Sequence, residues 1–233
     1  MGDRPNSTFN ATEQHLSVTR TARYWMLGGE AAGEVWLVCH GYGQLAQRFI
    51  RRFESIADSD CCIVAPEALS RFYLDGVGMH GPESPVGATW MTREDRLNEI
   101  EDYIAYLDAL YDHITSARDA RSVHVVALGF SQGAATVARW AARTERRIDH
   151  VVFWSGSFPP ELTVTPRLFG SARLMIVSGD ADPMARAAAA DTLSSQLEAG
   201  GLYPARIRHA GGHEVTADAL TVLAERVRDG RRV

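Results

Sequence analysis

Residues 129–133 read Gly-Phe-Ser-Gln-Gly and so place one serine hydroxyl between two glycines. The pattern G-x-S-x-G is typical of a tight turn between a strand and a helix, from which a nucleophilic serine projects. Glycines suit such a turn because the neighbouring backbones approach too closely for a Cβ atom. The flanks agree, since 122–128 is apolar and β-branched like a strand and 134–143 has the composition of a helix. We therefore expect Ser131 to be a nucleophile.

A serine hydroxyl reacts well only when a base takes its proton and an acid orients that base. Asp182 follows Ser131 by 51 residues, and His213 follows Asp182 by a further 31. Each lies just past the end of a predicted strand, and the carboxyl ends of parallel strands share one edge of a sheet. The sequence therefore predicts that these three residues meet, with His213 as the general base and Asp182 as its orienting carboxylate.

A second glycine turn, at residues 40–43, reads His-Gly-Tyr-Gly and follows the apolar strand expected at 34–39. Such a turn lets a backbone N–H point at the negative charge that develops on a substrate oxygen. We expect one arm of an oxyanion hole in this turn and the other at the amide of Gln132, the residue after the serine. The alternative is an ordinary glycine turn without that role. His40 is expected to stabilise the turn by hydrogen bonding rather than to carry protons.

Strands and helices are predicted to alternate along the chain. The expected strands span 16–27, 34–39, 61–65, 122–128, 149–154, 173–177 and 203–208, and the expected helices span 45–57, 92–115, 134–143, 185–199 and 217–229. This alternation predicts a mainly parallel sheet with helices on both faces, which is the α/β class. We expect one such domain at 16–233, preceded by a flexible leader at 1–15.

Residues 67–92 show no sustained hydrophobic period and are expected to form a long loop. A loop of this length in a compact domain usually covers or lines a site. Its aromatic residues, Phe72, Tyr73 and Trp90, suit an apolar acyl or aryl group, so the sequence predicts that they bind substrate. The alternative is that these side chains anchor the loop to its own domain.

Together these motifs resemble an α/β-hydrolase of the phospholipase/carboxylesterase group, which includes acyl-protein thioesterases. The resemblance extends from Val35 to the C-terminus and also rests on the order serine, aspartate, histidine. The segments that carry it are 40–43, 129–134, 179–183 and 212–213. It implies an α/β-hydrolase fold and hydrolysis of carboxylic esters or thioesters through an acyl-enzyme, with the amides of Tyr42 and Gln132 forming the oxyanion hole. It also implies that neither a cofactor nor a metal takes part.

Two of the predicted roles have a competing residue. Asp180 lies in the same turn as Asp182, but the resembled family places its acid at the fourth position of G-x-x-D-P, which favours Asp182. His209 competes with His213, but it lies at the end of the predicted strand 203–208 rather than in the loop that follows. Other functions of the same residues stay open, namely a non-hydrolytic small-molecule-binding protein of this fold, an acyltransferase or a peptidase.

Composition limits the class of partner. A net charge of −5 over 233 residues argues against nucleic acid or an anionic membrane as the main partner, but it is too mild to name one. The resemblance implies a small-molecule ester or thioester as the partner. Cys39, Cys61 and Cys62 lie in apolar runs without metal-ligand spacing, so we expect core residues and a reducing compartment. No apolar segment near the N-terminus has the pattern of a signal peptide or a membrane span, so a cytoplasmic location is expected. A monomer and a homodimer both fit the sequence.

Overall fold

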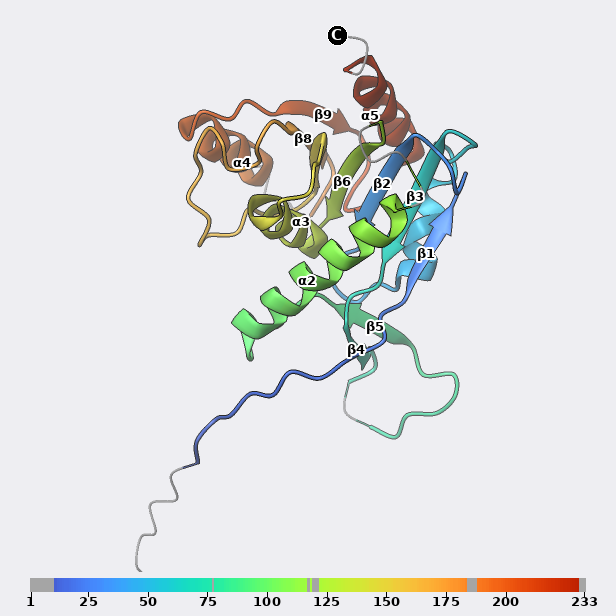
Figure 1. Ribbon diagram of the computed structural model, residues 1–233, viewed down its shortest axis with the longest axis vertical. Coiled ribbons are helices and arrows are strands. Elements are labelled where there is room, and N and C mark those ends of the chain that lie inside the picture. Colours follow the sequence, from blue (N-terminus) through green and yellow to red (C-terminus); the bar gives the residue numbers. More distant parts are fainter. Residues whose placement is uncertain (1–10, 77, 117, 119–121, 184–187, 231–233) are drawn as a thin grey trace, which may run out of the picture.

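The computed structural model describes residues 11–76, 78–116, 118, 122–183 and 188–230. Its main strands are β1 (Tyr24–Leu27), β2 (Glu34–Cys39), β3 (Cys61–Pro66), β6 (His124–Phe130), β7 (His150–Trp154), β8 (Arg173–Gly179) and β9 (Ala205–His209). They form one sheet in the order β1-β3-β2-β6-β7-β8-β9 (Figure 1). The pairing of β1 with β3 is antiparallel and the other five pairings are parallel. The predicted mainly parallel sheet is thus confirmed.

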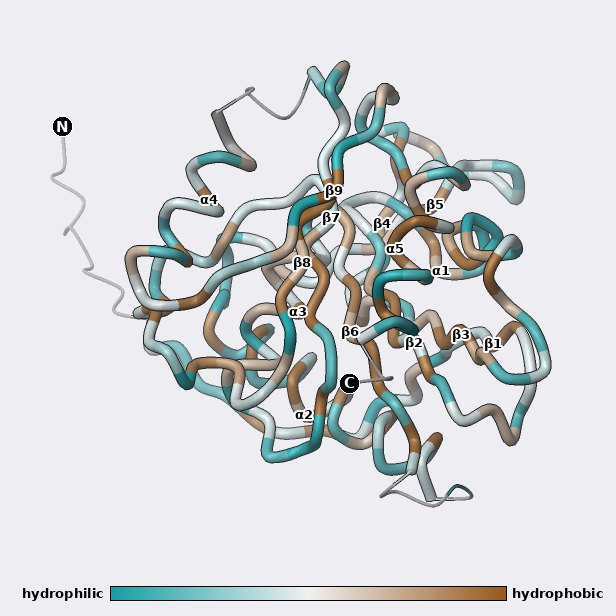
Figure 2. The backbone as a smooth tube through the Cα atoms, turned by 90° about the horizontal axis from the view of Figure 1, so that it is seen from above, coloured by the Kyte–Doolittle hydropathy of each residue, from teal (hydrophilic) through white to brown (hydrophobic). Residues whose placement is uncertain are grey.

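Helices cover both faces of this sheet (Figure 1). The helical segments are α1 (Ala46–Phe49), the 3₁₀ turn η1 (Ile50–Phe53), α2 (Arg96–Thr115), α3 (Gln132–Arg143), α4 (Ala188–Ala199) and α5 (Ala217–Asp229). Helices α2, α3 and α4 pack on one face, and α1, η1 and α5 pack on the other. Because side chains alternate along a strand, Val35 and Leu37 face the first cluster while Trp36 and Val38 face the second. Figure 2 shows the resulting hydrophobic centre along the strands.

Two expected elements are much shorter or less regular in the structure than the sequence predicts. The helix expected at 45–57 is a single turn followed by η1, in which Ile50 and Phe53 are buried together because residues three apart align in a 3₁₀ turn. The strand expected at 16–27 covers only Tyr24–Leu27, and Leu16 and Val18 are exposed. Residues 1–10 of the expected leader and 185–187 of an expected helix lie outside the described residues.

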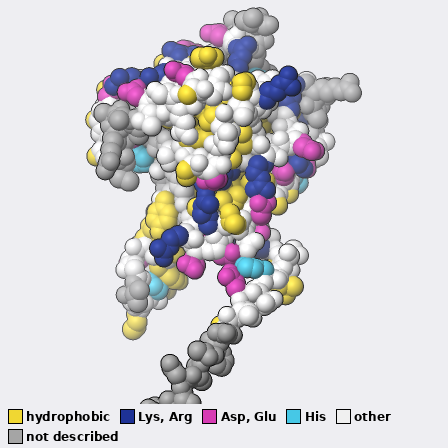
Figure 3. Space-filling view, turned by 90° about the vertical axis from the view of Figure 1, so that its left-hand side faces the viewer, with side chains coloured by type: hydrophobic (Ala, Val, Ile, Leu, Met, Phe, Trp, Pro, Cys, Tyr) yellow, Lys and Arg dark blue, Asp and Glu magenta, His cyan; other side chains and the backbone are white. Residues whose placement is uncertain are grey.

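The segment expected to be a long loop contains a β-hairpin instead. Strands β4 (Ser70–Tyr73) and β5 (Val86–Thr89) pair antiparallel, and the hairpin projects from the body of the molecule (Figures 1 and 3). Its base docks on the 40–43 turn, where the Gly43 amide donates to the Ala88 carbonyl at 2.9 Å. A Cβ atom on Gly87 would lie 2.4 Å from the Gly43 carbonyl oxygen, so this approach requires glycine. Each of these strands has only four residues, and β5 contains a glycine, so neither leaves a clear hydrophobic period in the sequence.

Two histidines lie at the amino ends of β6 and β7, opposite the edge where the predicted catalytic residues meet. His124 and His150 are both buried, and His124 Nε2 lies 3.0 Å from His150 Nδ1. Burial, assisted by the charges of His124 and Arg173, lowers the pKa of His150 to about 4. His150 is therefore neutral in the folded protein near neutral pH. Across the ranges that the structure describes, no helix is both long and apolar enough to cross a bilayer.

We expect His150 to make the protein less stable in acid. An unfolded histidine has a pKa of about 6.5, whereas that of folded His150 is about 4, so the unfolded state takes up the proton first. Stability is thus lost as the pH falls through this window, by about 2–3 kcal/mol at about pH 4.5. Urea unfolding of the wild type and of His150→Asn at neutral pH and at about pH 4.5 measures this loss. Between these two pH values, His150→Asn should lose about 2–3 kcal/mol less stability than the wild type. Equal losses in the two proteins would contradict the role given to His150.

Candidate active site

Ser131 lies between β6 and α3 in a strained backbone conformation, with φ 54° and ψ −116°. The residues two positions before and two positions after it are glycines, because no side chain fits at either position. A Cβ atom on Gly129 would lie 2.1 Å from the Gly133 carbonyl oxygen, and one on Gly133 would lie 2.2 Å from the Cys39 carbonyl oxygen. The Ser131 amide donates to the Trp154 carbonyl at 2.9 Å. The serine therefore occupies the strand-to-helix turn that its sequence pattern predicts.

Asp182 and His213 are joined by a hydrogen bond of 2.7 Å between Asp182 Oδ2 and His213 Nδ1. The Asp182 side chain is fully buried and that of His213 is 23% exposed. An ionised carboxylate only accepts hydrogen bonds, so Nδ1 carries the proton and the Nε2 lone pair is left for another partner. The loops after β8 and β9 are held together because the Ala181 amide donates to the Gly211 carbonyl at 3.1 Å. A Cβ atom on Gly179 would lie 2.4 Å from that same oxygen.

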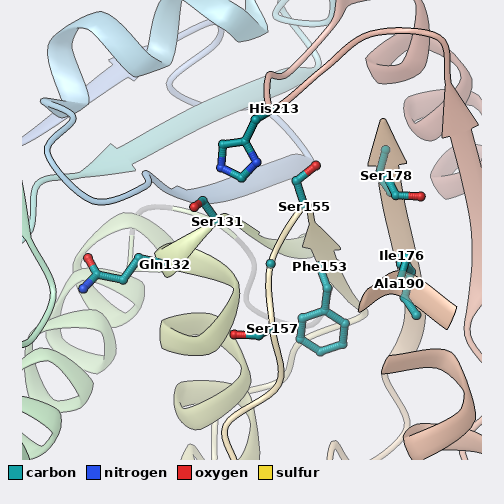
Figure 4. Close-up of a pocket in the computed structure, with 11 residues that line it drawn as sticks. Ser131, Gln132, Phe153, Ser155, Ser157, Ile176, Ser178, Ala190 and His213 are labelled. Atoms are coloured by element: carbon teal, nitrogen blue, oxygen red, sulfur yellow. The ribbon is translucent and has the colours of Figure 1, made fainter. Parts of the chain in front are cut away.

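The His213 ring and the Ser131 hydroxyl line the same pocket (Figure 4). The Phe130 ring packs against the imidazole with 4.9 Å between ring centroids. Trp154 Nε1 donates to the Glu214 carbonyl at 3.0 Å. This hydrogen bond holds the loop that carries His213 against the end of β7. Within the described part of the chain, no hydrogen bond joins Ser131 Oγ to the ring; in ligand-free active sites such bonds are often long and shorten only when substrate binds.

The two competing residues lie outside this arrangement. Asp180 is half exposed and pairs with Arg208 at 2.7 Å, as a surface carboxylate does. His209 Nδ1 accepts a hydrogen bond from the Gly211 amide at 3.2 Å, and His209 does not line the serine pocket. The geometry therefore favours the residues that the sequence favoured, Asp182 and His213.

The amides expected to form the oxyanion hole lie on both sides of the serine. Tyr42 belongs to the turn after β2, and Gln132 begins α3, whose amino end carries partial positive charge. A Cβ atom on Gly41 would lie 3.2 Å from Ser131 Cβ, so this turn runs directly against the serine. Among the described residues, neither the Tyr42 amide nor the Gln132 amide makes a hydrogen bond. Both donors are therefore available to a substrate oxygen.

His40 is a structural residue of this turn. Its Nδ1 donates to the Gly41 carbonyl at 2.8 Å, and its Nε2 accepts from the Ala68 amide at 3.1 Å. Burial lowers the pKa of His40 below its ordinary value, so the ring stays neutral. With both nitrogens bonded, His40 stabilises the turn, as the sequence predicts.

The Gln132 side chain connects the catalytic turn to the end of the hairpin. Its Oε1 accepts from the Trp90 amide at 3.2 Å, while its Nε2 donates to Thr89 Oγ1 at 3.0 Å and to the Met91 carbonyl at 2.8 Å. Trp90 Nε1 in turn donates to the His40 carbonyl at 2.8 Å. These bonds hold the 89–91 segment against both glycine turns.

The three aromatic residues predicted to bind substrate do not line the serine pocket. Trp90 is 2% exposed and belongs to the core. The Phe72 ring packs against Tyr42 with 5.1 Å between centroids, and Tyr73 stacks on His80 at 3.9 Å. These contacts favour the alternative that the sequence left open, in which the aromatic residues anchor the segment to its own domain; substrate binding by them stays a prediction.

The serine pocket has a volume of about 220 Å³ and lies between the ends of β7 and β8, α3 and α4 (Figure 4). Besides the residues already described, it is lined by the apolar side chains of Phe153, Ile176, Val177 and Ala190, by Gly156, and by Ser155, Ser157 and Ser178. Sequence analysis missed these residues. The available signal was position, because all of them except Ala190 of α4 lie in or just after the carboxyl-terminal half of β7 or β8, beside the predicted catalytic residues.

Residues able to bind a metal, and the cysteines, lie away from this pocket. Glu13, His15 and Asp95 place their possible ligand atoms within 4.8 Å of one another, but they are exposed and belong to the N-terminal segment and the start of α2. The three cysteines are free and buried, as expected of core residues. Burial raises the pKa of the Cys39 and Cys61 thiols, which makes them poor nucleophiles.

A family model described as serine hydrolase (FSH1) matches residues 35–223. The chain belongs to the FSH1 serine hydrolase family. Its serine lies at a nucleophile turn of the kind on which hydrolases of this fold depend. No protein of curated function is detectably similar to this FSH1 family member in sequence.

Several solved structures resemble this family member over nearly its whole length. The esterase PE8 shares 21% identity, with 90% of this chain and 99% of that chain covered and a TM-score of 0.63. Zea mays acyl-protein thioesterase 2 shares 17% identity, with 90% and 99% covered and a TM-score of 0.68. A carboxylesterase from Mesorhizobium loti shares 16% identity, with 89% and 94% covered and a TM-score of 0.68. The expected α/β-hydrolase fold and the resemblance to this group are confirmed.

We expect Gln132→Ala to destabilise the protein by about 1–3 kcal/mol, because it leaves polar groups of residues 89–91 without partners. The measurement is urea unfolding followed by tryptophan fluorescence. Gln47→Ala is the matched control, since Gln47 is an exposed residue of α1. Equal stability of the two variants would show that the Gln132 side chain does not hold this segment.

Proposed function

We propose that this FSH1 family member hydrolyses short carboxylic esters or thioesters through an acyl-enzyme on Ser131. The observation that carries the proposal is the buried 2.7 Å hydrogen bond from His213 to Asp182, in the pocket that Ser131 also lines. Nucleophile, base and orienting acid are the parts that acyl transfer requires. Family membership supports hydrolysis, and the arrangement of these side chains supports the mechanism.

In the first step, His213 Nε2 takes the proton of the Ser131 hydroxyl while Oγ bonds to the substrate carbonyl carbon. Asp182 remains ionised and accepts the Nδ1 hydrogen bond, so it stabilises the imidazolium that forms. The tetrahedral intermediate then loses the alcohol or thiol, which receives its proton from His213. The acyl group stays attached to Ser131 as an ester.

In the second step, His213 takes a proton from water, whose oxygen attacks the acyl carbon. The bond to Ser131 Oγ breaks, and Oγ receives the proton from His213. The carboxylic acid leaves and the starting enzyme is restored. During both steps the carbonyl oxygen becomes negative and accepts hydrogen bonds from the Tyr42 and Gln132 amides. One such donor contributes about 3 kcal/mol of transition-state stabilisation in comparable hydrolases.

The pocket favours a small acyl group. Its volume of about 220 Å³ is below the range of roughly 300–1,000 Å³ that is usual for drug-sized ligands. Phe153, Ile176 and Ala190 give it an apolar lining suited to a short chain. We therefore propose short-chain esters and thioesters as the substrates rather than long-chain lipids.

A fluorophosphonate should label Ser131 and no other residue, because an activated serine attacks its phosphorus as it would attack a carbonyl. Peptide mapping by mass spectrometry locates the adduct, and Ser131→Ala should prevent labelling while leaving the far-ultraviolet circular dichroism unchanged. An adduct at another residue, or none under conditions that label other serine hydrolases, would refute the proposal. Labelling without turnover of any short ester would favour a binding protein instead.

Asp182→Asn should lower kcat by about 10⁴-fold, because an amide favours the wrong tautomer of the histidine. The matched control is Asp180→Asn, which makes the same change in the same turn and should leave kcat within about twofold, since Asp180 is an exposed surface residue. Initial rates on p-nitrophenyl butyrate give both values. If the two variants lost activity equally, Asp182 would not be the orienting acid.

A further inference from the structure

Ser155 is an unusual residue of the serine pocket. It follows β7 with a φ of 47°, a left-handed conformation that strains most non-glycine residues. Its Oγ is buried and has no hydrogen-bond partner among the described residues. Ser155 lines the pocket together with Ser131 and His213, and Figure 4 shows its side chain on the opposite side of the His213 ring from Ser131.

The backbone around Ser155 is firmly held, so its conformation is part of the fold. The Ser155 amide donates to the Val177 carbonyl at 2.8 Å. A Cβ atom on the next residue, Gly156, would lie 2.6 Å from the Ser131 carbonyl oxygen and 2.3 Å from Ala134 Cβ. The 155–156 segment therefore rests directly against the catalytic turn, and Ser155 lies one residue from that contact.

The fold alone does not account for a serine at this position. Glycine adopts a positive φ without strain, and it would leave no hydroxyl to be buried without a partner. A buried hydroxyl without a partner is unfavourable until something supplies a hydrogen bond. Rotation about χ1 turns the Ser155 hydroxyl toward the pocket that this residue lines. A ligand oxygen in the pocket is then the missing partner.

The part of the substrate that enters this pocket is the acyl group. During the proposed reaction the leaving group departs after the first step, whereas the acyl group remains bonded to Ser131 through both. A partly enclosed pocket that begins at Ser131 therefore serves the acyl group. Its apolar lining contacts the chain, while Ser155 adds a hydrogen-bonding group to the same pocket that Ser131 lines.

We propose that Ser155 is a specificity-determining residue that selects short hydroxyacyl groups, in which a hydroxyl lies on the second or third carbon. This inference rests on the proposed ester hydrolysis at Ser131. The Ser155 hydroxyl forms a hydrogen bond with the hydroxyl of the acyl group, and so gains the partner that it lacks in the free enzyme. An unsubstituted acyl chain leaves the Ser155 hydroxyl unpaired and is therefore the poorer substrate.

The test compares kcat/KM for ethyl butanoate, ethyl 2-hydroxybutanoate and ethyl 3-hydroxybutanoate, followed by acid release in a pH-stat. The wild type should prefer at least one hydroxy ester to ethyl butanoate. Ser155→Ala should reduce that preference by about fivefold, the effect expected of one uncharged hydrogen bond. Ser157→Ala should keep the preference, because Ser157 lines the same pocket but is solvent-exposed.

Ser155→Gly separates the hydroxyl from the backbone strain. It should lose the preference as Ser155→Ala does, yet melt at a higher temperature than Ser155→Ala, because glycine relieves the positive φ. If the wild type showed no preference for a hydroxy ester, or if Ser155→Ala slowed all three esters equally, the inference would be overturned while ester hydrolysis stood. If the wild type cleaved none of the three esters and no thioester, the proposed function itself would fail.

Discussion

The contact on which the rest of the site depends is the backbone packing around Ser131. Strand β6, helix α3 and the turn after β2 meet so closely that no side chain would fit at Gly129 or Gly133. This packing keeps Ser131 in its strained conformation, since the turn cannot relax without moving β2 or α3. It also brings the Tyr42 and Gln132 amides to the same serine. A single steric constraint therefore positions both the predicted nucleophile and the predicted oxyanion donors.

The parallel sheet brings the remaining groups to this point. Strand β8 pairs with β7, and β9 pairs with β8, all in parallel, so the loops that carry Asp182 and His213 emerge at the same edge as Ser131. Trp154 connects the Ser131 turn to the loop that carries His213. Its carbonyl accepts a hydrogen bond from the Ser131 amide, and its indole donates one to the Glu214 carbonyl. The Asp182 carboxylate is buried, which keeps its hydrogen bond to His213 away from competing water.

Sequence analysis predicts those features that depend on local pattern. Strand β2 and helix α5 appear with the predicted bounds, because a continuous apolar run and a clear helical period leave little choice. Ser131, Asp182 and His213 were identified from motif and order, and the structure brings them to one edge. The β4–β5 hairpin was missed because its pairing depends on contact with the Gly43 turn, which is distant in sequence.

The residues that line the serine pocket could not be predicted from the sequence for a related reason. Trp90 is aromatic and lies in the 67–92 segment that was expected to line a site, but whether an indole faces a ligand or the core depends on tertiary packing. The residues that do line the pocket, such as Ser155 and Ala190, are small and common in loops and helices, so nothing in their type marks them. Their role follows only from the arrangement of β7, β8 and α4 around the serine.

The most direct test of the acyl-enzyme is the partitioning of products between water and methanol. Butanoate esters and thioesters with different leaving groups all form the same butanoyl-Ser131 intermediate in this account. The ratio of methyl butanoate to butanoic acid at a fixed methanol concentration should therefore be the same for every leaving group. A ratio that changes with the leaving group would contradict a shared intermediate and, with it, the central role given to Ser131.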